Sequence, residues 1–249
     1  MTTPTPRPRL QLLDGFELRL AGCVVALTIG SQRLLAFLAL HNRQLPRAFV
    51  AGMLWPEVPT GRANANLRAG LWRLPPACRM IVDQSSQHLR LTTDMVVDFH
   101  GAVALAERLL DRSRSCLEDL SVAHRRLSGE LLPDWYNDDW VLLERERFHQ
   151  LRLHALEVLC EGLVSAGRYG EAIDAGLAVV RAEPLRESAH RVLIKAHLAE
   201  GNVGEAFRQY QACHRLLQDE LGVQPSARLR ELVDAAAPRD RLHAPVTVA

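Results

Sequence analysis

The chain has 249 residues, of which 48% are hydrophobic and 24% are charged, and its formal net charge is +1. This composition predicts packed globular cores and excludes a disordered chain, and because no apolar run reaches 18 residues it predicts no transmembrane helix. The five cysteines are scattered and form no Cys-x-x-Cys pair, which argues against a disulfide framework or a zinc site.

Charge is distributed unevenly along the chain. Residues 1–97 contain 11 basic and 5 acidic residues, a net charge of +6, whereas residues 98–249 carry a net charge of −5. This asymmetry predicts two domains, 9–97 and 98–236, of which the first contacts a polyanion. Flexible tails are expected at 1–8 and 237–249. The first of these lacks the apolar stretch of a signal peptide, which predicts a cytoplasmic protein.

Short apolar segments begin the first domain. Phe16–Leu20 alternates between apolar and charged residues, as in a half-buried strand, and Ala21-Gly22 can turn the chain into Cys23–Leu27. Leu10–Leu13 is a third candidate strand. The chain is therefore expected to open with a small antiparallel sheet.

Three helices are predicted next. The first runs over Gln32–His41 and can be capped by Gly30-Ser31, and the second is the short segment Arg47–Leu54. The third covers Thr60–Leu74 and is ended by Pro75-Pro76, because proline cannot continue a helix.

The third helix carries the main functional signal. Helical spacing gathers its apolar side chains on one side and leaves Arg, Asn and small residues outside, with no acidic residue between Thr60 and Asp83. Arg can pair with guanine and Asn with adenine in the major groove, and small residues let a helix approach DNA closely. An Arg-rich helix face is also common as plain solvated surface. The candidate DNA contacts on this helix are Arg62, Asn64, Asn66, Arg68, Trp72 and Arg73.

A hairpin is predicted directly after this helix. Ile81–Asp83 and His88–Leu91 read as two strands joined by the polar turn Gln84–Gln87. A hairpin that follows a recognition helix is a wing, which usually contacts phosphates or the minor groove. Sheet, helices and hairpin in this order predict a winged helix-turn-helix domain. Further candidate DNA contacts are Ser85, Ser86, Gln87 and His88 in the turn, with Arg33 and Arg47 on the earlier helices.

From Asp98 onward the chain is expected to be all-helical. Gly167–Ala172 recurs as Gly201–Ala206, an offset of 34 residues, which is the period of tetratricopeptide helix–turn–helix units. Additional helices are needed to cover these two repeats. They are predicted at 98–111, at 115–129, from Asp139 to Ala166 and from Ser226 to about Ala236. The fold class is therefore mainly α, a winged helix-turn-helix with small antiparallel sheets followed by a tetratricopeptide-like domain.

Eight motifs resemble one known family, the Streptomyces antibiotic regulatory protein (SARP) family of activators with its bacterial transcriptional activation domain. They are Ser31–Ala36, Leu54–Pro56, Arg62–Arg68, Leu71–Leu74, Gly129–Tyr136, Trp140–Arg147, Glu183–His190 and Glu220–Ser226. The resemblance covers roughly Leu10 to Ala236.

The resemblance implies a transcriptional activator that binds direct repeats in promoter DNA as a dimer and recruits RNA polymerase holoenzyme. Such a protein would control a biosynthetic or developmental gene cluster and would be associated with the nucleoid. Relatives commonly continue the recognition helix with basic residues where this chain has Pro75-Pro76, so affinity is expected to depend more on dimerisation, on polymerase, or on Arg33, Arg43 and Arg47.

No enzymatic motif is present. The sequence lacks a phosphate-binding P-loop, an H-E-x-x-H pair and a G-x-S-x-G elbow. Asp134, Asp138 and Asp139 cluster without an accompanying base or nucleophile, and one of the latter two is expected to cap the long helix. No catalytic residue, metal or cofactor is predicted. The alternative function is a tetratricopeptide-type interaction scaffold or effector sensor with little DNA specificity of its own.

Overall fold

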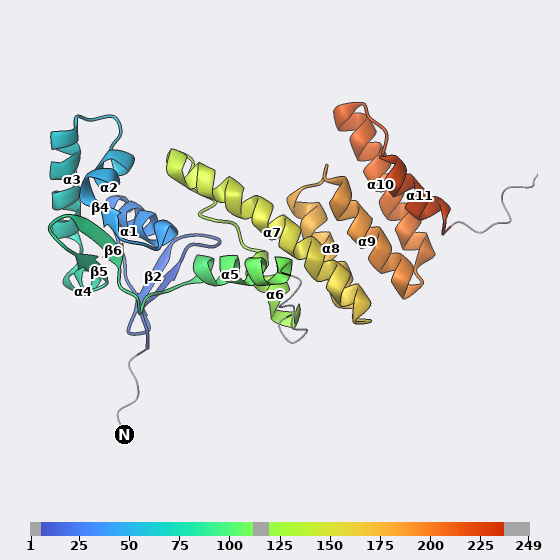
Figure 1. The fold of residues 1–249 in the computed structure, drawn as a ribbon, viewed down its shortest axis with the longest axis horizontal. Helices are drawn as coiled ribbons and strands as arrows, with labels where there is room; N and C mark the ends of the chain where they lie inside the picture. Colours follow the sequence, from blue (N-terminus) through green and yellow to red (C-terminus); the bar gives the residue numbers. More distant parts are fainter. Residues whose placement is uncertain (1–5, 112–119, 237–249) are drawn as a thin grey trace, which may run out of the picture. The chain divides into compact units, whose positions relative to one another are not determined.

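The computed structural model describes residues 6–111 and 120–236. Most of both predicted tails, Cys116 and the start of the helix expected at 115–129 lie outside these residues. The chain forms two compact units, Met1–Leu105 with Gly129–Gln150 and Ala106–Ser128 with Leu151–Ala249. In Figure 1 the small strands lie among the first helices in sequence, and only helices follow α5. The predicted fold class is confirmed.

The first sheet has four strands in the order β3-β2-β1-β7. The three expected strands form as β1 (Arg9–Gln11), β2 (Glu17–Leu20) and β3 (Cys23–Val24), each shorter than predicted. The fourth, β7 (Val96–Val97), pairs parallel with β1. This strand was not predicted, because two residues show no periodicity that the sequence could reveal.

The three predicted helices form with small changes at their ends. The first helix, α1, covers Ile29–His41, because the side chain of Thr28 accepts a hydrogen bond from the Ser31 N–H and moves the cap upstream of the predicted Gly30-Ser31. The second, α2, covers Arg47–Leu54 as predicted. The third, α3, covers Thr60–Arg73.

The pair Pro75-Pro76 ends α3 as predicted and also begins a short helix, α4 (Pro76–Arg79). Proline is well suited to the first turn of a helix, where its missing N–H is not needed. The Nε–H of Arg79 donates to the Leu74 carbonyl oxygen at 2.9 Å, and a terminal amino group of the same guanidinium donates to the Trp72 carbonyl oxygen. Arg79 of α4 thus satisfies two carbonyls left free at the end of α3.

The predicted hairpin forms from β5 (Val82–Gln84) and β6 (His88–Leu91), with Asp83 opposite Arg90. A two-residue strand, β4 (Leu45–Pro46), pairs with the other edge of β6 and completes a three-stranded sheet. This pairing ties the hairpin to the start of α2, since β4 runs directly into that helix.

Residues Gly129–Gln150 pack in the first unit, although the sequence division places them in the second domain. The Trp140 ring, only 7% exposed, meets the Phe37 ring edge-on at 5.1 Å between centroids. The Leu132 N–H donates to the Leu12 carbonyl oxygen at 2.9 Å. The compact units describe how the chain packs. The domain boundary at residue 98 therefore stays a prediction.

Two helices pass from one unit into the other: α5 covers Asp98–Leu110 and α7 covers Asp139–Ser165. The remaining helices of the second unit are α6 (Leu120–Leu127), α8 (Tyr169–Ala182), α9 (Glu187–Glu200), α10 (Val203–Leu221) and α11 (Ala227–Asp234). None of the helices described is long and apolar enough to cross a membrane.

The 34-residue repeat corresponds to equivalent turns and contacts. Gly167 and Gly201 adopt positive φ angles of 72° and 91°, which glycine tolerates without strain, immediately before α8 and α10. Ala172 and Ala206, at the same place in these two helices, are completely buried. Their small side chains fit the close packing that brings α9 against both α8 and α10.

Candidate nucleic-acid interface

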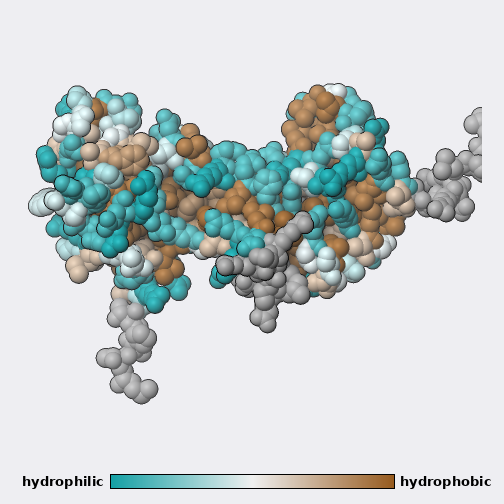
Figure 2. All heavy atoms as spheres, in the orientation of Figure 1, coloured by the Kyte–Doolittle hydropathy of each residue, from teal (hydrophilic) through white to brown (hydrophobic). Residues whose placement is uncertain are grey.

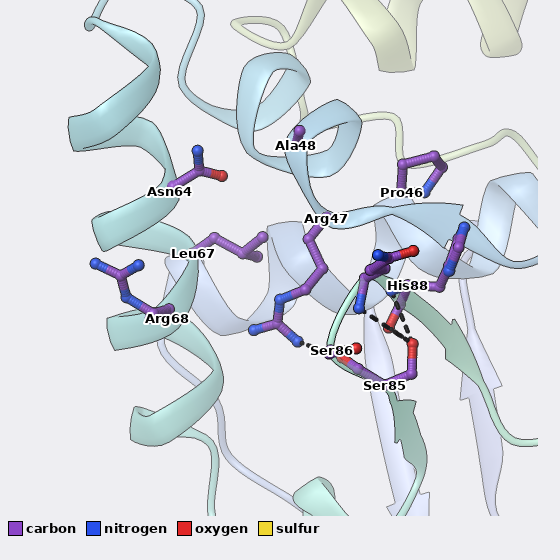
Figure 3. A pocket seen from close by; sticks show the side chains of 10 residues that line it. Pro46, Arg47, Ala48, Asn64, Leu67, Arg68, Ser85, Ser86 and His88 are labelled. Atoms are coloured by element: carbon purple, nitrogen blue, oxygen red, sulfur yellow. Dashed lines mark hydrogen bonds between the residues drawn. The ribbon is translucent and has the colours of Figure 1, made fainter.

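An open groove of about 710 Å³ lies between α3, the start of α2 and the tip of the β5–β6 hairpin (Figure 3). Its walls come from three separate stretches of sequence: the second sheet joins the start of α2 to the hairpin, and α3 packs against α2. The lining residues are Pro46, Arg47, Ala48, Asn64, Leu67, Arg68, Ser85, Ser86, Gln87 and His88.

The pattern of burial on α3 decides which side chains reach the groove. Ala63, Leu67 and Leu71 are buried against the domain core and fix the rotation of the helix. Asn64 and Arg68 are one helical turn apart, at the edge of this buried face. In Figure 3, Asn64 points toward the start of α2, whereas the Arg68 guanidinium extends away from the hairpin over the exposed side of α3.

The hairpin tip has a defined conformation because its backbone groups are bonded. The Ser85 Oγ accepts hydrogen bonds from the His88 N–H at 2.9 Å and the Gln87 N–H at 3.3 Å. From α2, the Arg47 N–H donates to the Gln87 carbonyl oxygen at 2.8 Å and its guanidinium donates to the Ser85 carbonyl oxygen at 3.3 Å. The tip is therefore held against α2, with Ser86 and Gln87 exposed.

The residues that line the groove carry a net positive charge. Its lining contains two arginines and a histidine and no Asp or Glu. The nearest acid on the hairpin, Asp83, forms an ion pair with Arg90 at 2.8 Å and is thereby neutralised. Hydrophilic residues dominate the surface over α3, β5 and β6 in Figure 2. A polar, positive groove beside an exposed helix suits a polyanion better than an apolar ligand.

Seven predicted site residues come together in this groove: Arg47, Asn64, Arg68, Ser85, Ser86, Gln87 and His88. Trp72 lies one turn beyond Arg68 on the same exposed side of α3 and outside the groove. Arg62, Asn66 and Arg73 are about half a helical turn further round α3 and also do not line it.

Arg33 is engaged elsewhere. Its guanidinium forms a bidentate pair with the Asp138 carboxylate, with Nε at 3.0 Å and 3.1 Å from the two oxygens, and also donates to the Leu54 carbonyl oxygen at 3.2 Å. These bonds engage Nε and one of the two terminal amino groups of Arg33, which indicates a structural role for this side chain. The Asp138 carboxylate also accepts a hydrogen bond from the Trp140 indole N–H at 3.1 Å.

Sequence reasoning did not identify the contributions of Pro46, Ala48 and Leu67 to the groove. Leu67 lies on the apolar side of α3 and is 1% exposed. Pro46 and Ala48 reach the groove through the pairing of β4 with β6, and a two-residue strand leaves no readable pattern. The basic residue Arg47 beside them was the only signal in this segment.

The model of the bacterial transcriptional activator domain family matches residues 93–235. The chain belongs to this family. The match extends over the whole of the 34-residue repeat and over the segment Gly129–Gln150 that packs in the first unit.

Curated relatives extend the similarity of this bacterial transcriptional activator domain protein into its first unit. It is 30% identical over 232 residues to regulatory protein AfsR of Streptomyces coelicolor, covering 83% of this chain and 22% of AfsR. The Streptomyces coelicolor transcriptional regulator RedD is 37% identical over 83 residues, covering 33% of this chain and 24% of RedD. The chain thus spans about a fifth to a quarter of the length of these relatives. The resemblance to the SARP family is confirmed.

A solved structure supports the fold. The structure of Mycobacterium tuberculosis EmbR in complex with a low-affinity phosphopeptide superposes with a TM-score of 0.72 at 22% identity, covering 93% of this chain and 66% of that one. At this identity the similarity establishes a common fold.

Proposed function

We propose that this protein is a sequence-specific DNA-binding transcriptional activator. The observation that carries the proposal is the acid-free groove between α3 and the hairpin, which combines Arg47, Asn64 and Arg68 with an ordered, exposed hairpin tip. Membership of an activator domain family and similarity to two Streptomyces regulators supply independent support. The proposed function involves no catalysis.

In this proposal α3 enters the major groove and the hairpin lies on the phosphate backbone. The 14 residues of α3 span about 21 Å, and a B-DNA major groove about 12 Å wide admits an α-helix. Arg68 can donate two hydrogen bonds to a guanine and Asn64 can pair with an adenine. The exposed polar groups of Ser86 and Gln87 would contact phosphates, which position the helix without reading sequence.

The remaining partners follow from the family. We propose that the protein binds promoter direct repeats as a dimer and recruits RNA polymerase holoenzyme, as a cytoplasmic, nucleoid-associated protein. The family match over residues 93–235 supports an activating role for the second unit.

The first test is selection of genomic DNA fragments by the purified full chain at about physiological salt. We expect enrichment of promoter fragments that carry a short direct repeat. Enrichment that appears only when RNA polymerase holoenzyme is added would mean that recognition depends on polymerase. Continued failure would contradict DNA recognition and favour the interaction scaffold or effector sensor.

Two matched variants then locate the contact on α3. Removing a base-reading arginine costs about 1–3 kcal/mol, so Arg68→Ala should weaken operator binding about 5- to 150-fold. Arg73→Ala removes the same side chain from the other flank of the same helix and should have a much smaller effect. Equal effects of the two substitutions in a fluorescence-anisotropy titration would contradict the proposed orientation of α3.

A further inference from the structure

The exposed side of α3 ends in one large aromatic side chain. Trp72 is 75% exposed, although burying an aromatic ring of this size is favourable. Asn64, Arg68 and Trp72 are spaced four residues apart and therefore follow one line along the helix. Trp72 thus faces the same way as Arg68, toward the surface that the proposed function assigns to DNA.

The indole is held in place by Arg79 of α4. The Arg79 guanidinium lies over the ring at 5.8 Å from its centroid, and its charge is attracted to the ring face. The hydrogen bonds from the same guanidinium to the Leu74 and Trp72 carbonyl oxygens fix it against the last turn of α3. The ring is therefore oriented in the free protein while most of it remains accessible.

The chemistry of an indole limits what it can recognise on a base-pair edge. It has one N–H donor and no acceptor, and the rest of its surface is apolar. In the major groove, the apolar group that distinguishes one base from the others is the C5-methyl of thymine. Ala69 lies beside Trp72 on the helix surface and Ala65 lies one turn before Ala69, and their small side chains leave room for close approach.

We propose that Trp72 is a specificity-determining residue that contacts the C5-methyl group of a thymine, and that Arg79 is a positioning residue for its ring. This inference rests on the proposed function, because it requires α3 to lie in the major groove. Four helical residues span about 6 Å and base pairs are stacked about 3.4 Å apart, so the thymine lies within about two base pairs of the base that Arg68 contacts.

The test replaces single thymines of the selected operator with deoxyuridine, which removes the methyl group and leaves the hydrogen-bonding groups unchanged. Burying one methyl group predicts a loss of wild-type affinity of about three- to fivefold at one position near the Arg68 contact. Trp72→Ala should bind the thymine operator more weakly and should no longer distinguish thymine from deoxyuridine there. Because Trp72 is largely exposed, this variant is expected to fold, which thermal melting checks.

Two further variants separate positioning from contact. Arg79→Ala should reduce the ratio between the affinity for the thymine operator and the affinity for the deoxyuridine operator. General destabilisation of the protein does not change this ratio. Met80→Ala alters the neighbouring residue, which is 79% exposed, and should leave that ratio at its wild-type value.

Three results would overturn the proposal. The Trp72 contact would be wrong if deoxyuridine lowered the operator affinity of Trp72→Ala as much as that of the wild type. It would also be wrong if deoxyuridine lowered neither affinity. In both cases operator binding that depends on Arg68 would still support the proposed function. Failure to find any operator, with or without polymerase, would overturn both.

Discussion

The ion pair between Arg33 and Asp138 illustrates how a residue's role depends on a partner far away in sequence. Arg33 is a basic side chain on a helix of the predicted winged helix-turn-helix domain, and the local pattern favours a phosphate contact. Its actual partner is 105 residues away, at the start of α7. Local sequence cannot reveal this pairing, because it depends on how Gly129–Gln150 folds back onto the first unit.

We therefore expect Arg33→Ala to affect stability. The side chains of the pair are only 28% and 11% exposed, so the substitution leaves a poorly solvated carboxylate and should lower the free energy of unfolding by about 2 kcal/mol. Arg19→Ala is the matched control, since the Arg19–Glu17 pair is 50% and 34% exposed and should contribute less than about 0.5 kcal/mol. Urea denaturation measures both, and similar losses would contradict the structural role.

His190 gives a pH-dependent prediction. Burial lowers the pKa of His190, whose ring contacts the Pro184 carbonyl oxygen at 2.8 Å and the Gln209 amide nitrogen at 2.7 Å. The unfolded chain, with a histidine pKa near 6.5, then binds more protons than the folded one, so this stabilisation is present above pH 6.5 and is lost as the pH falls below it.

The measurement compares urea midpoints at about pH 7.5 and pH 5.5. We expect His190→Gln to show a smaller acid-induced loss than the wild type. Because each protein is compared with itself, the cost of the substitution cancels. An equal loss in both proteins would exclude His190 as the origin of the effect.

At the scale of elements, the sequence predicted the long or strongly patterned ones and missed the short ones. The second helix and the hairpin formed where alternation, spacing and turn residues agreed. The strands β4 and β7 and the helix α4 have two to four residues, too few for any periodicity. Yet β4 brings Arg47 to the hairpin tip. The shape of the groove could therefore not be predicted from the sequence, whereas most of its polar residues could.

Two helical glycines in contrasting surroundings give a prediction at this scale. A Cβ at Gly70 of α3 would have its nearest neighbour, Trp55, at 3.9 Å, whereas a Cβ at Gly176 of α8 would approach Leu193 atoms at 3.2–3.3 Å. Alanine is favoured over glycine inside helices by about 1 kcal/mol. Gly70→Ala should therefore stabilise the protein by about that amount and Gly176→Ala should destabilise it, as measured by thermal melting. A gain of stability for Gly176→Ala would mean that α8 and α9 separate easily.

At the scale of the whole molecule, the charge asymmetry and the repeat predicted two parts. The boundary predicted at residue 98 differs from the division into two compact units. Asp138, Trp140 and Leu132 belong to a stretch that reads as ordinary helical-domain sequence. The first two nevertheless contact α1, and Leu132 bonds to Leu12, the residue that follows β1. Nothing in their own pattern identifies the surface that they cover.

This packing predicts the behaviour of fragments. A fragment ending at residue 97 lacks the side chains that cover Phe37 and neutralise Arg33, so it should melt at a lower temperature than a fragment ending at residue 150. Circular dichroism on heating measures both. Identical melting temperatures would show that Gly129–Gln150 contributes little to the first unit.

The return of Gly129–Gln150 to the first unit also affects how such proteins can exchange parts. The first unit, which we propose to bind DNA, is encoded in two separate stretches of chain, so one crossover near residue 97 would transfer the helices and hairpin without the segment that carries Asp138 and Trp140. A hybrid of this chain with a relative would then place Arg33 opposite the residue that the relative has at the position of Asp138. Under the proposed function, recombination would therefore transfer DNA recognition between such proteins only where that second stretch is inherited together with the first or is compatible with it.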